Sequence, residues 1–376
     1  MKILHISFHT APFGNIGKND SGGLNVYVEN ISNELSKYNQ VTVITAENAD
    51  SFTKGNLEFL SFNLFDKDLP VEEKEIYLQE FLDKIRDTYD LMSFDLIHAH
   101  YWLSGLVGRK LSNEFNKPFV YTSHSLGVFL EGYNKERVDC EKLIMDSSNK
   151  VTVSSTYEKT AILENYKIEP SKLELITPGV NKEIFSPDLA VKRENIFLSI
   201  GRIQEQKGQI KILKFLNNFR KINNDFLCYF VGGPSGKLGN EYLEELKSFV
   251  SEMNLNSNVE FLGSLPQSNI KKLMNKSKLL IHASTFETFG LIAIEANSMG
   301  VPVLTINEGS LSEIIENNIN GYISENLVDA GVNRYVHKIL NDSKKYEEIM
   351  YSCIEKSKDF DWVYTVKKIE KIYKSF

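Results

Sequence analysis

Short runs of apolar and β-branched residues recur along the chain, and each is followed by a segment whose apolar positions have helical spacing. After the first run, for example, Val28, Ile31, Leu35 and Tyr38 fall on one face of a predicted helix. Strands that alternate with helices in this way predict βαβ units and parallel sheets. The predicted strands are 3–7, 41–46, 96–99, 119–123 and 151–154 in a first series, and 197–200, 227–231, 259–262, 279–282 and 301–305 in a second.

Two series of strands in a chain of 376 residues predict two doubly wound α/β domains, because a single hydrophobic core stops growing at about 250–300 residues. The boundary is placed at 180/181, where Pro178, Gly179 and Pro187 break regular structure. We therefore expect an N-terminal Rossmann-like domain over 1–180 and a C-terminal one over 181–359. The last segment, 360–376, is predicted to be a helix that crosses back to the N-terminal domain.

The composition is that of an ordinary globular protein, with 42% hydrophobic and 25% charged residues, which excludes a disordered or fibrous chain. The net charge of −7 argues against nucleic-acid binding. Cys140, Cys228 and Cys353 have no metal-ligand spacing and favour a reducing compartment. No stretch approaches the ~18 apolar residues of a membrane span, and the lysines between 367 and 374 are interpreted as a solvated helix face. We expect a cytoplasmic protein without membrane association.

A glycine-rich stretch, 14–23, follows the first predicted strand and precedes the first predicted helix. Gly22 and Gly23 allow a ligand to approach the backbone closely, and the helix N-terminus behind them offers N–H groups to an anion. The spacing is not that of the dinucleotide fingerprint. The alternative is a simple flexible loop.

His100 and His124 each directly follow a predicted strand, and the two strands are expected to be neighbours. Because parallel strands present their carboxyl ends at one edge of a sheet, both imidazoles should face a ligand there. A histidine satisfied within the core is the alternative for either residue. Zinc-ligand spacing is lacking, so we predict no metal site and favour hydrogen bonding to a polar substrate.

The second domain opens with Arg202 and Lys207 on either side of a turn that directly follows a strand. Two cations beside the N–H groups of a helix suit a diphosphate, although either could be a plain surface charge. Residues 232–237 (GGPSGK) look like a phosphate-binding P-loop, but that motif would need glycine at Val231 and a hydroxyl at Leu238. A nucleoside triphosphatase is therefore disfavoured.

Glu287 and Glu295 are separated by seven residues, including Gly290. Eight helical steps rotate a side chain by about 800°, so the two carboxylates would not share a helix face. They converge only if Glu287 lies in a loop and Gly290 starts the helix that carries Glu295. Carboxylates accept hydrogen bonds from paired hydroxyls, which points to a sugar or ribose. The alternative is an exposed loop glutamate and a helix-surface glutamate.

These motifs together resemble one family. Glu287 to Glu295 matches the E-x7-E motif of the GT-B retaining glycosyltransferases of family 4, and Arg202 with Lys207 matches that family's diphosphate pair. The resemblance extends over essentially the whole chain and implies two Rossmann-like domains that face a cleft. Within the family, the chain looks like the MshA-like inositol-phosphate N-acetylglucosaminyltransferases and the sucrose-phosphate synthases. The segments that carry this likeness are 7–12, 22–28, 98–105, 124–127, 232–236 and 265–268.

The resemblance also implies a donor site for a nucleotide sugar, mainly in the C-terminal domain. Arg202 and Lys207 would neutralise the diphosphate in place of a metal, so no cofactor is expected. Glu295 would bind ribose hydroxyls and Glu287 would hold the sugar. The other implied donor contacts are Gly23, Phe289, Gly290 and Leu291. The implied catalytic residues are Arg202, Lys207, Glu287 and His124.

An acceptor site for a phosphate group is implied in the N-terminal domain. The matching positions are Lys67, Tyr101, Ser125 and Arg137, with His124 beside them. Ser125 stands where the MshA-like enzymes have threonine.

The sequence therefore predicts a retaining hexosyltransferase that uses a nucleotide sugar, with UDP favoured, and a small phosphorylated sugar or polyol as acceptor. One alternative is a transferase with an unphosphorylated acceptor such as an aminocyclitol, a glycan or a lipid. Another is a non-transferring GT-B protein, such as a nucleotide-sugar epimerase or a binding module. Whether the protein forms a homodimer is left open.

Overall fold

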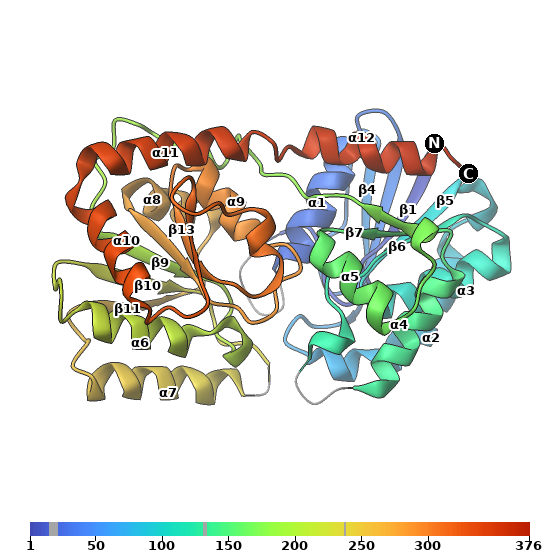
Figure 1. Cartoon of the computed structure of the whole chain (residues 1–376). Coiled ribbons are helices and arrows are strands. Elements are labelled where there is room, and N and C mark those ends of the chain that lie inside the picture. Colours follow the sequence, from blue (N-terminus) through green and yellow to red (C-terminus); the bar gives the residue numbers. More distant parts are fainter. Residues whose placement is uncertain (15–21, 131–133, 237) are drawn as a thin grey trace. The chain divides into compact units, whose positions relative to one another are not determined.

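The computed structural model describes residues 1–14, 22–130, 134–236 and 238–376. Among these residues the chain forms two compact units (Figure 1). Unit 1 holds the residues from Met1 to Pro178 together with Trp362–Phe376, and unit 2 is Gly179–Asp361. Most of the glycine-rich stretch 14–23 and Lys237 of the GGPSGK segment lie outside the described residues.

Unit 1 is built on a sheet that has eight strands within the described residues, in the order β3-β4-β2-β1-β5-β6-β7-β8. All neighbouring strands are parallel except β3 and β4. The strands are β1 (Lys2–Ile6), β2 (Gln40–Glu47), β3 (Phe52–Lys54), β4 (Leu57–Phe65), β5 (Leu96–His100), β6 (Phe119–Thr122), β7 (Lys150–Val153) and β8 (Leu173–Leu175).

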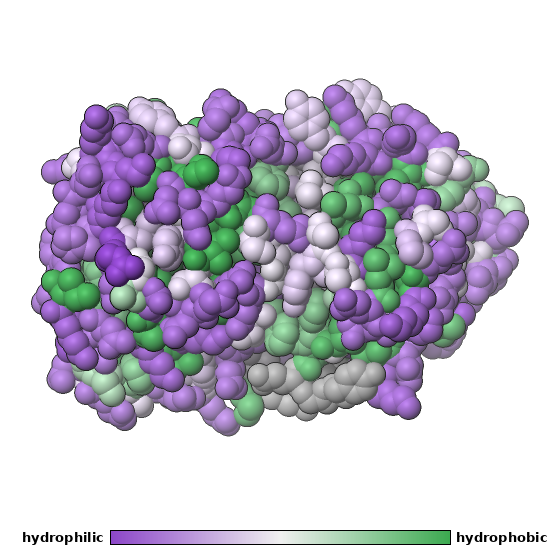
Figure 2. Space-filling view, viewed as in Figure 1, coloured by the Kyte–Doolittle hydropathy of each residue, from purple (hydrophilic) through white to green (hydrophobic). Residues whose placement is uncertain are grey.

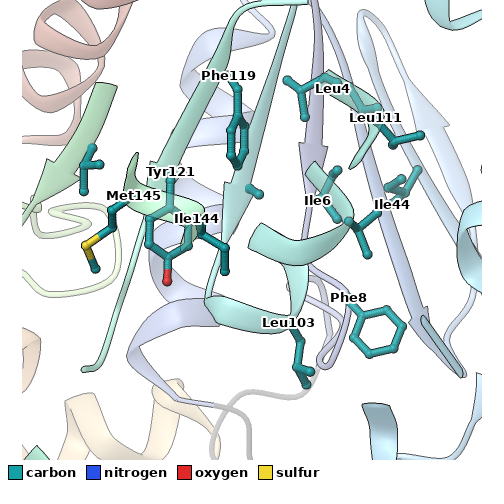
Figure 3. Close-up of a cluster of buried hydrophobic side chains, with 14 of the residues drawn as sticks. Leu4, Ile6, Phe8, Ile44, Leu103, Leu111, Phe119, Tyr121, Ile144 and Met145 are labelled. Atoms are coloured by element: carbon teal, nitrogen blue, oxygen red, sulfur yellow. The ribbon is translucent and has the colours of Figure 1, made fainter. Parts of the chain in front are cut away.

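Helices cover both faces of this sheet (Figure 1). They are α1 (Gly23–Leu35), α2 (Leu78–Thr88), α3 (Trp102–Phe115), α4 (Lys135–Ser147), α5 (Thr156–Asn165) and α12 (Trp362–Tyr373). The core between sheet and helices is apolar, and Figure 3 shows Leu4 and Ile6 of β1 near Ile44 of β2 and Leu111 of α3. The prediction that Tyr38 lies on the buried face of the first helix is wrong, because the helix ends at Leu35 and Tyr38 is 80% exposed.

Helix α12 belongs to unit 1 although it is far from the rest of that unit in the sequence. It packs against α1, and its side chains Trp362, Val366, Ile369 and Tyr373 are buried. Its opposite face is exposed and carries the lysines between 367 and 374.

Unit 2 contains a parallel sheet, six-stranded within the described residues, in the order β11-β10-β9-β12-β13-β14. Its strands are β9 (Ile196–Ile200), β10 (Leu227–Val231), β11 (Val259–Gly263), β12 (Leu279–His282), β13 (Val303–Ile306) and β14 (Gly321–Ser324). Its helices are α6 (Gln209–Phe219), α7 (Gly239–Glu252), α8 (Gln267–Lys276), α9 (Leu291–Ser298), α10 (Ala330–Asn341) and α11 (Ser343–Ser357). They again lie on both faces of the sheet (Figure 1).

The predicted parallel α/β architecture is confirmed, and every predicted strand is present within one to two residues at its ends. Strands β3, β4, β8 and β14 were not predicted. The chain passes between the units after Pro178 and after Asp361, against the expected boundaries 180/181 and 359/360.

Hydrophilic residues cover most of the face drawn in Figure 2, with smaller hydrophobic groups between them. Among the described helices, none combines the length and the apolar character that crossing a bilayer requires.

Candidate functional site

The strand order of each sheet reverses at one position, and several of the predicted functional residues follow the strands on either side of it. In unit 2 the chain adds β10 and β11 on one side of β9 and then returns to place β12 on the other. Arg202 and Lys207 follow β9, and Glu287 follows β12. In unit 1 the reversal lies between β1 and β5, and Tyr101 follows β5. Ligands of doubly wound folds bind at such positions.

Lys207 and Glu287 form an ion pair in unit 2, with the Lys207 Nζ 2.9 Å from Glu287 Oε2. His282, the last residue of β12, contacts the same oxygen through its Nε2 at 3.2 Å. Burial alone would raise the pKa of Glu287, but Lys207 and the hydrogen bond from His282 hold that pKa well below its usual range. The carboxylate therefore stays ionised.

The loops that carry this pair are joined through their backbones. The amide of Thr285 donates to the carbonyl of Gln206 at 3.0 Å, and the hydroxyl of Ser284 donates to the same carbonyl at 3.2 Å. Gly208 has a positive φ of +68°, and a Cβ there would lie 2.1 Å from the carbonyl oxygen of Ala283. Only glycine allows the loop after β9 to pass this close to the loop after β12.

Arg202 lies in the same loop as Lys207. Its Nη1 is 3.5 Å from the hydroxyl of Ser235, a residue of the GGPSG segment after β10. The side-chain amide of Gln204 donates to the carbonyl of Ser235 at 3.3 Å. The loop after β10 therefore contacts the loop that carries both predicted diphosphate ligands.

Glu295 lies within α9, which begins at Leu291 with Gly290 as its N-cap. The predicted arrangement, with Glu287 in a loop and Gly290 before the helix, is confirmed. The Glu295 side chain is buried and has no hydrogen-bond or ion-pair partner among the described residues, and burial raises the pKa of this carboxyl to about 8. A buried carboxyl without a partner is costly unless a ligand supplies one. The backbone N–H groups of Phe289, Gly290 and Leu291 likewise donate to no described residue.

In unit 1, three of the four predicted acceptor residues meet. Arg137 of α4 is buried, and its Nη1 donates to the Tyr101 hydroxyl at 3.2 Å while its Nη2 donates to the Ser125 hydroxyl at 2.9 Å. The guanidinium also lies 5.0 Å from the centre of the Tyr101 ring. Glu141, one turn along α4, accepts from the Arg137 Nε at 2.8 Å, from the amide of Gly127 and from the hydroxyl of Tyr166.

The fourth predicted acceptor residue, Lys67, is exposed in the loop after β4 and contacts none of the other three. A different lysine is buried in this unit. Lys74 is fully buried, and its Nζ donates to the carbonyl of His9 at 2.8 Å, while the His9 ring lies 4.3 Å from the Tyr101 ring. No pattern in the sequence separates Lys74 from the exposed charged residues around it.

The histidines behind these loops form a polar network. The Nδ1 of His100 and the Nε2 of His124 are 3.1 Å apart, and His124 has a positive φ of 59°. His5, His98 and His100 have nitrogens within 4.8 Å of one another, as metal ligands would. However, both nitrogens of His5 and of His98 already have hydrogen-bond partners, and both rings contact the hydroxyl of Tyr373. Burial lowers the pKa of His5 and of His124 to about 3, so both imidazoles are neutral.

Gly23 is the first residue of α1 and is exposed. His282 is the residue that sequence reasoning missed in unit 2. The signal was present, because His282 is the last residue of a predicted strand, much as His100 directly follows one, and it lies five residues before Glu287.

Two family models match the chain, one in each half. The model for Glycosyltransferase Family 4 matches residues 21–184, and the model for Glycosyl transferases group 1 matches residues 180–355. Together the two models extend over most of the chain, so the protein belongs to the glycosyltransferases that they describe. It has the GT-B fold.

The particular relatives agree with this class. The D-inositol 3-phosphate glycosyltransferase of Corynebacterium glutamicum (strain R) is 25% identical over 99% of this chain and 96% of its own length. The solved sucrose-phosphate synthase (tll1590) of Thermosynechococcus elongatus superposes with a TM-score of 0.89 at 24% identity, covering 100% of this chain and 98% of that one. Anabaena Alr3699/HepE, solved in complex with UDP and glucose, has a TM-score of 0.81 at 20% identity and full coverage of both chains. These structures confirm the predicted fold.

Proposed function

We propose that the protein is a retaining glycosyltransferase that moves a hexosyl group from a UDP-linked sugar to a small phosphorylated sugar or polyol. The observation that carries the phosphorylated acceptor is the arrangement around Arg137, whose two terminal nitrogens meet the hydroxyls of Tyr101 and Ser125. A planar guanidinium beside two hydroxyl groups is a donor set that suits the oxygens of a phosphate monoester.

The contact with the Glu141 carboxylate orients Arg137. Glu141 takes the Nε edge of the guanidinium and is itself fixed by the amide of Gly127 and the hydroxyl of Tyr166. The Nη1 and Nη2 edge is therefore left for the two hydroxyls, the carbonyl of Ser125 and a ligand. A side chain that is held in place before binding loses little entropy when the ligand arrives.

The donor half of the proposal rests on unit 2. Lys207 and Arg202 supply two cations in one loop, and the unpaired Glu295 carboxyl supplies an acceptor for the hydroxyls of a ribose. The UDP, UDP-glucose and UDP-with-glucose complexes of the Anabaena protein support a uridine nucleotide. The inositol 3-phosphate in the names of the Corynebacterium relatives supports a phosphorylated acceptor.

Transfer then needs no nucleophile from the protein. The bond from the sugar to the diphosphate breaks, and the acceptor hydroxyl forms the new glycosidic bond on the same face of the ring. The proton of that hydroxyl goes to the departing phosphate oxygen. Arg202 and Lys207 stabilise the negative charge that develops on the diphosphate. The Oε1 of Glu287 and the amides of 289–291 orient the sugar.

The test of the phosphorylated acceptor is a pair of substitutions that remove only a hydroxyl. Tyr101→Phe and Ser125→Ala should each raise the acceptor KM about 10-fold or more, because a hydrogen bond to a charged group contributes about 1.5–3 kcal/mol. The donor KM should change by less than about 2-fold. Tyr38→Phe, at an exposed tyrosine, is the matched control. Lys67→Ala, measured in the same way, tests whether this exposed lysine also contacts the phosphate.

The substrates are identified by a screen for UDP release. Donors are UDP-glucose and UDP-N-acetylglucosamine, and acceptors are inositol phosphate and fructose 6-phosphate beside their unphosphorylated forms. Turnover with the unphosphorylated forms alone would overturn the phosphate assignment. The anomeric configuration of the product, read by NMR, decides between retention and inversion.

A further inference from the structure

Two hydrogen-bond donors share one oxygen of the Glu287 carboxylate. The Nζ of Lys207 lies 2.9 Å from Oε2, and the Nε2 of His282 lies 3.2 Å from the same atom. The other oxygen, Oε1, has no partner among the residues that the structure describes. One oxygen is therefore fixed by the protein while the other remains available to a ligand.

The two partners differ in burial. The side chain of His282 is 7% exposed, whereas those of Lys207 and Glu287 are 19% and 17% exposed. His282 therefore contacts the carboxylate from the interior, at the end of β12, and Lys207 contacts it from the side that remains partly open. Of the two partners, Lys207 is therefore the one that can move toward a ligand, because its side chain is not enclosed by the core.

The backbone of Glu287 is fixed independently of its side chain. Its carbonyl accepts from the amide of Ser310 at 3.0 Å. Gly309 has a positive φ of 73°, and a Cβ there would lie 2.9 Å from both the nitrogen and the oxygen of Glu287. Since the backbone is held, the direction of the carboxylate depends on Lys207 and His282.

A bound diphosphate competes with Glu287 for Lys207. The diphosphate carries more charge than one carboxylate, so the ammonium group is drawn toward it. Glu287 would then lose its charged partner at the moment when its Oε1 is needed by the sugar. A partly buried carboxylate that loses its charged partner is destabilised and reorients unless a second hydrogen bond holds it.

We propose that His282 is a positioning residue that holds the Oε2 of Glu287 while Lys207 exchanges the carboxylate for the donor diphosphate. The imidazole Nε2–H keeps Oε1 directed at the sugar hydroxyls throughout the exchange. This inference rests on the proposed function, because it requires a nucleotide sugar in unit 2.

The test compares two replacements of His282. His282→Gln keeps an N–H donor at a similar reach, and His282→Leu keeps the bulk and removes the donor. The probes are UDP and UDP-glucose, or the donor that turns over, with binding measured by calorimetry and turnover by UDP release. His337→Leu, the same change on an exposed residue of α10, is the control, and thermal unfolding verifies that each variant is folded.

His282→Leu should weaken UDP binding by a smaller factor than it lowers kcat, since UDP has no sugar for Glu287 to hold and the carboxylate can turn toward solvent when Lys207 leaves it. It should lower kcat about 10-fold or more, equivalent to the loss of one hydrogen bond to a charged group. His282→Gln should recover most of kcat. A purely structural role would lower UDP binding and kcat together and would not be rescued by glutamine.

The possible failures are separable. A wild type that turns over a UDP-sugar while His282→Leu matches it overturns the role of His282 alone. Equal losses of UDP affinity and kcat in His282→Leu also overturn it. A wild type that binds neither probe overturns the proposed function, and this inference with it.

Discussion

The hydroxyl of Tyr373 joins α12 to the centre of the unit 1 sheet. It lies 2.6 Å from the Nδ1 of His98 on β5 and 3.2 Å from the Nε2 of His5 on β1. All three side chains are buried. One hydroxyl can donate to one ring nitrogen and accept from an N–H of the other, so both contacts can be satisfied at once. Tyr373→Phe removes this hydroxyl and keeps the ring.

The cost follows from what remains after the substitution. The other nitrogens of the two rings keep their partners, Ser32 for His5 and Thr122 for His98. The nitrogens that faced the hydroxyl become buried and unpaired, and a buried group of this kind costs about 1–3 kcal/mol. Because the contact to His5 is long, we expect Tyr373→Phe to lower the free energy of unfolding of unit 1 by about 2–4 kcal/mol in total.

A matched control exists in the same unit. The hydroxyl of Tyr121 is buried without a partner among the described residues, and Figure 3 shows it near Ile144 and Met145. Tyr121→Phe makes the same chemical change and should be neutral or slightly stabilising, since an unpaired buried hydroxyl is itself unfavourable.

The assay is urea unfolding followed by tryptophan fluorescence. The two tryptophans of the chain, Trp102 and Trp362, both lie in unit 1, so the signal reports this unit. Linear extrapolation gives the free energy for the wild type and each variant. A Tyr373→Phe value within about 0.5 kcal/mol of the Tyr121→Phe value would refute the reasoning, because it would mean that the two histidines do not depend on the hydroxyl.

Three further predictions concern pH, the unpaired carboxyl and a glycine. His5 has a pKa of about 3 in the folded protein against 6.5 in the unfolded chain. Its contribution to the free energy of unfolding is therefore complete above pH 6.5 and is lost at about 1.4 kcal/mol per pH unit below it. An unfolding free energy, monitored by fluorescence, that is flat from pH 7 to 5 would contradict this. Glu295→Gln removes a carboxyl whose pKa is raised to about 8 by burial. Because a raised carboxyl pKa disfavours folding as the pH rises, the variant should be more stable than the wild type at pH 9 by circular dichroism, yet it should bind UDP more weakly. Tighter binding of UDP would exclude the ribose contact. Gly208→Ala introduces a Cβ 2.1 Å from the Ala283 oxygen and should abolish UDP binding. Gly55→Ala, at a positive φ with nothing within 4 Å of the added Cβ, should lower the free energy of unfolding by about 1 kcal/mol and leave UDP binding intact. Equal effects of the two substitutions on UDP binding would argue against the close approach.

Much of the fold follows from local pattern, because the predicted strands are short apolar runs that pack on both faces. Two of the four unpredicted strands fail this criterion. β3 is exposed along its whole length, and β8 has only three residues. Their pairing is decided by neighbouring strands, which hydrophobic periodicity does not encode.

In the candidate site, too, local spacing could be predicted from the sequence and tertiary contacts could not. Glu287, Gly290 and Glu295 could be placed because the two carboxylates converge in only one arrangement of loop and helix. His282 and Tyr373 could not be assigned partners from local pattern. The contact of Tyr373 with His5 spans 368 residues of sequence, and a tertiary contact of this kind leaves no periodic signal.

The return of α12 to unit 1 affects how the chain folds during synthesis. Unit 2 is continuous in sequence, so it can complete its core once Asp361 has left the ribosome. Unit 1 emerges first but waits for its last helix, and until then the buried face of α1 and the rings of His5 and His98 have no covering. The half that is made first is therefore the half that finishes last. We expect nascent chains that stop before Trp362 to depend on chaperones.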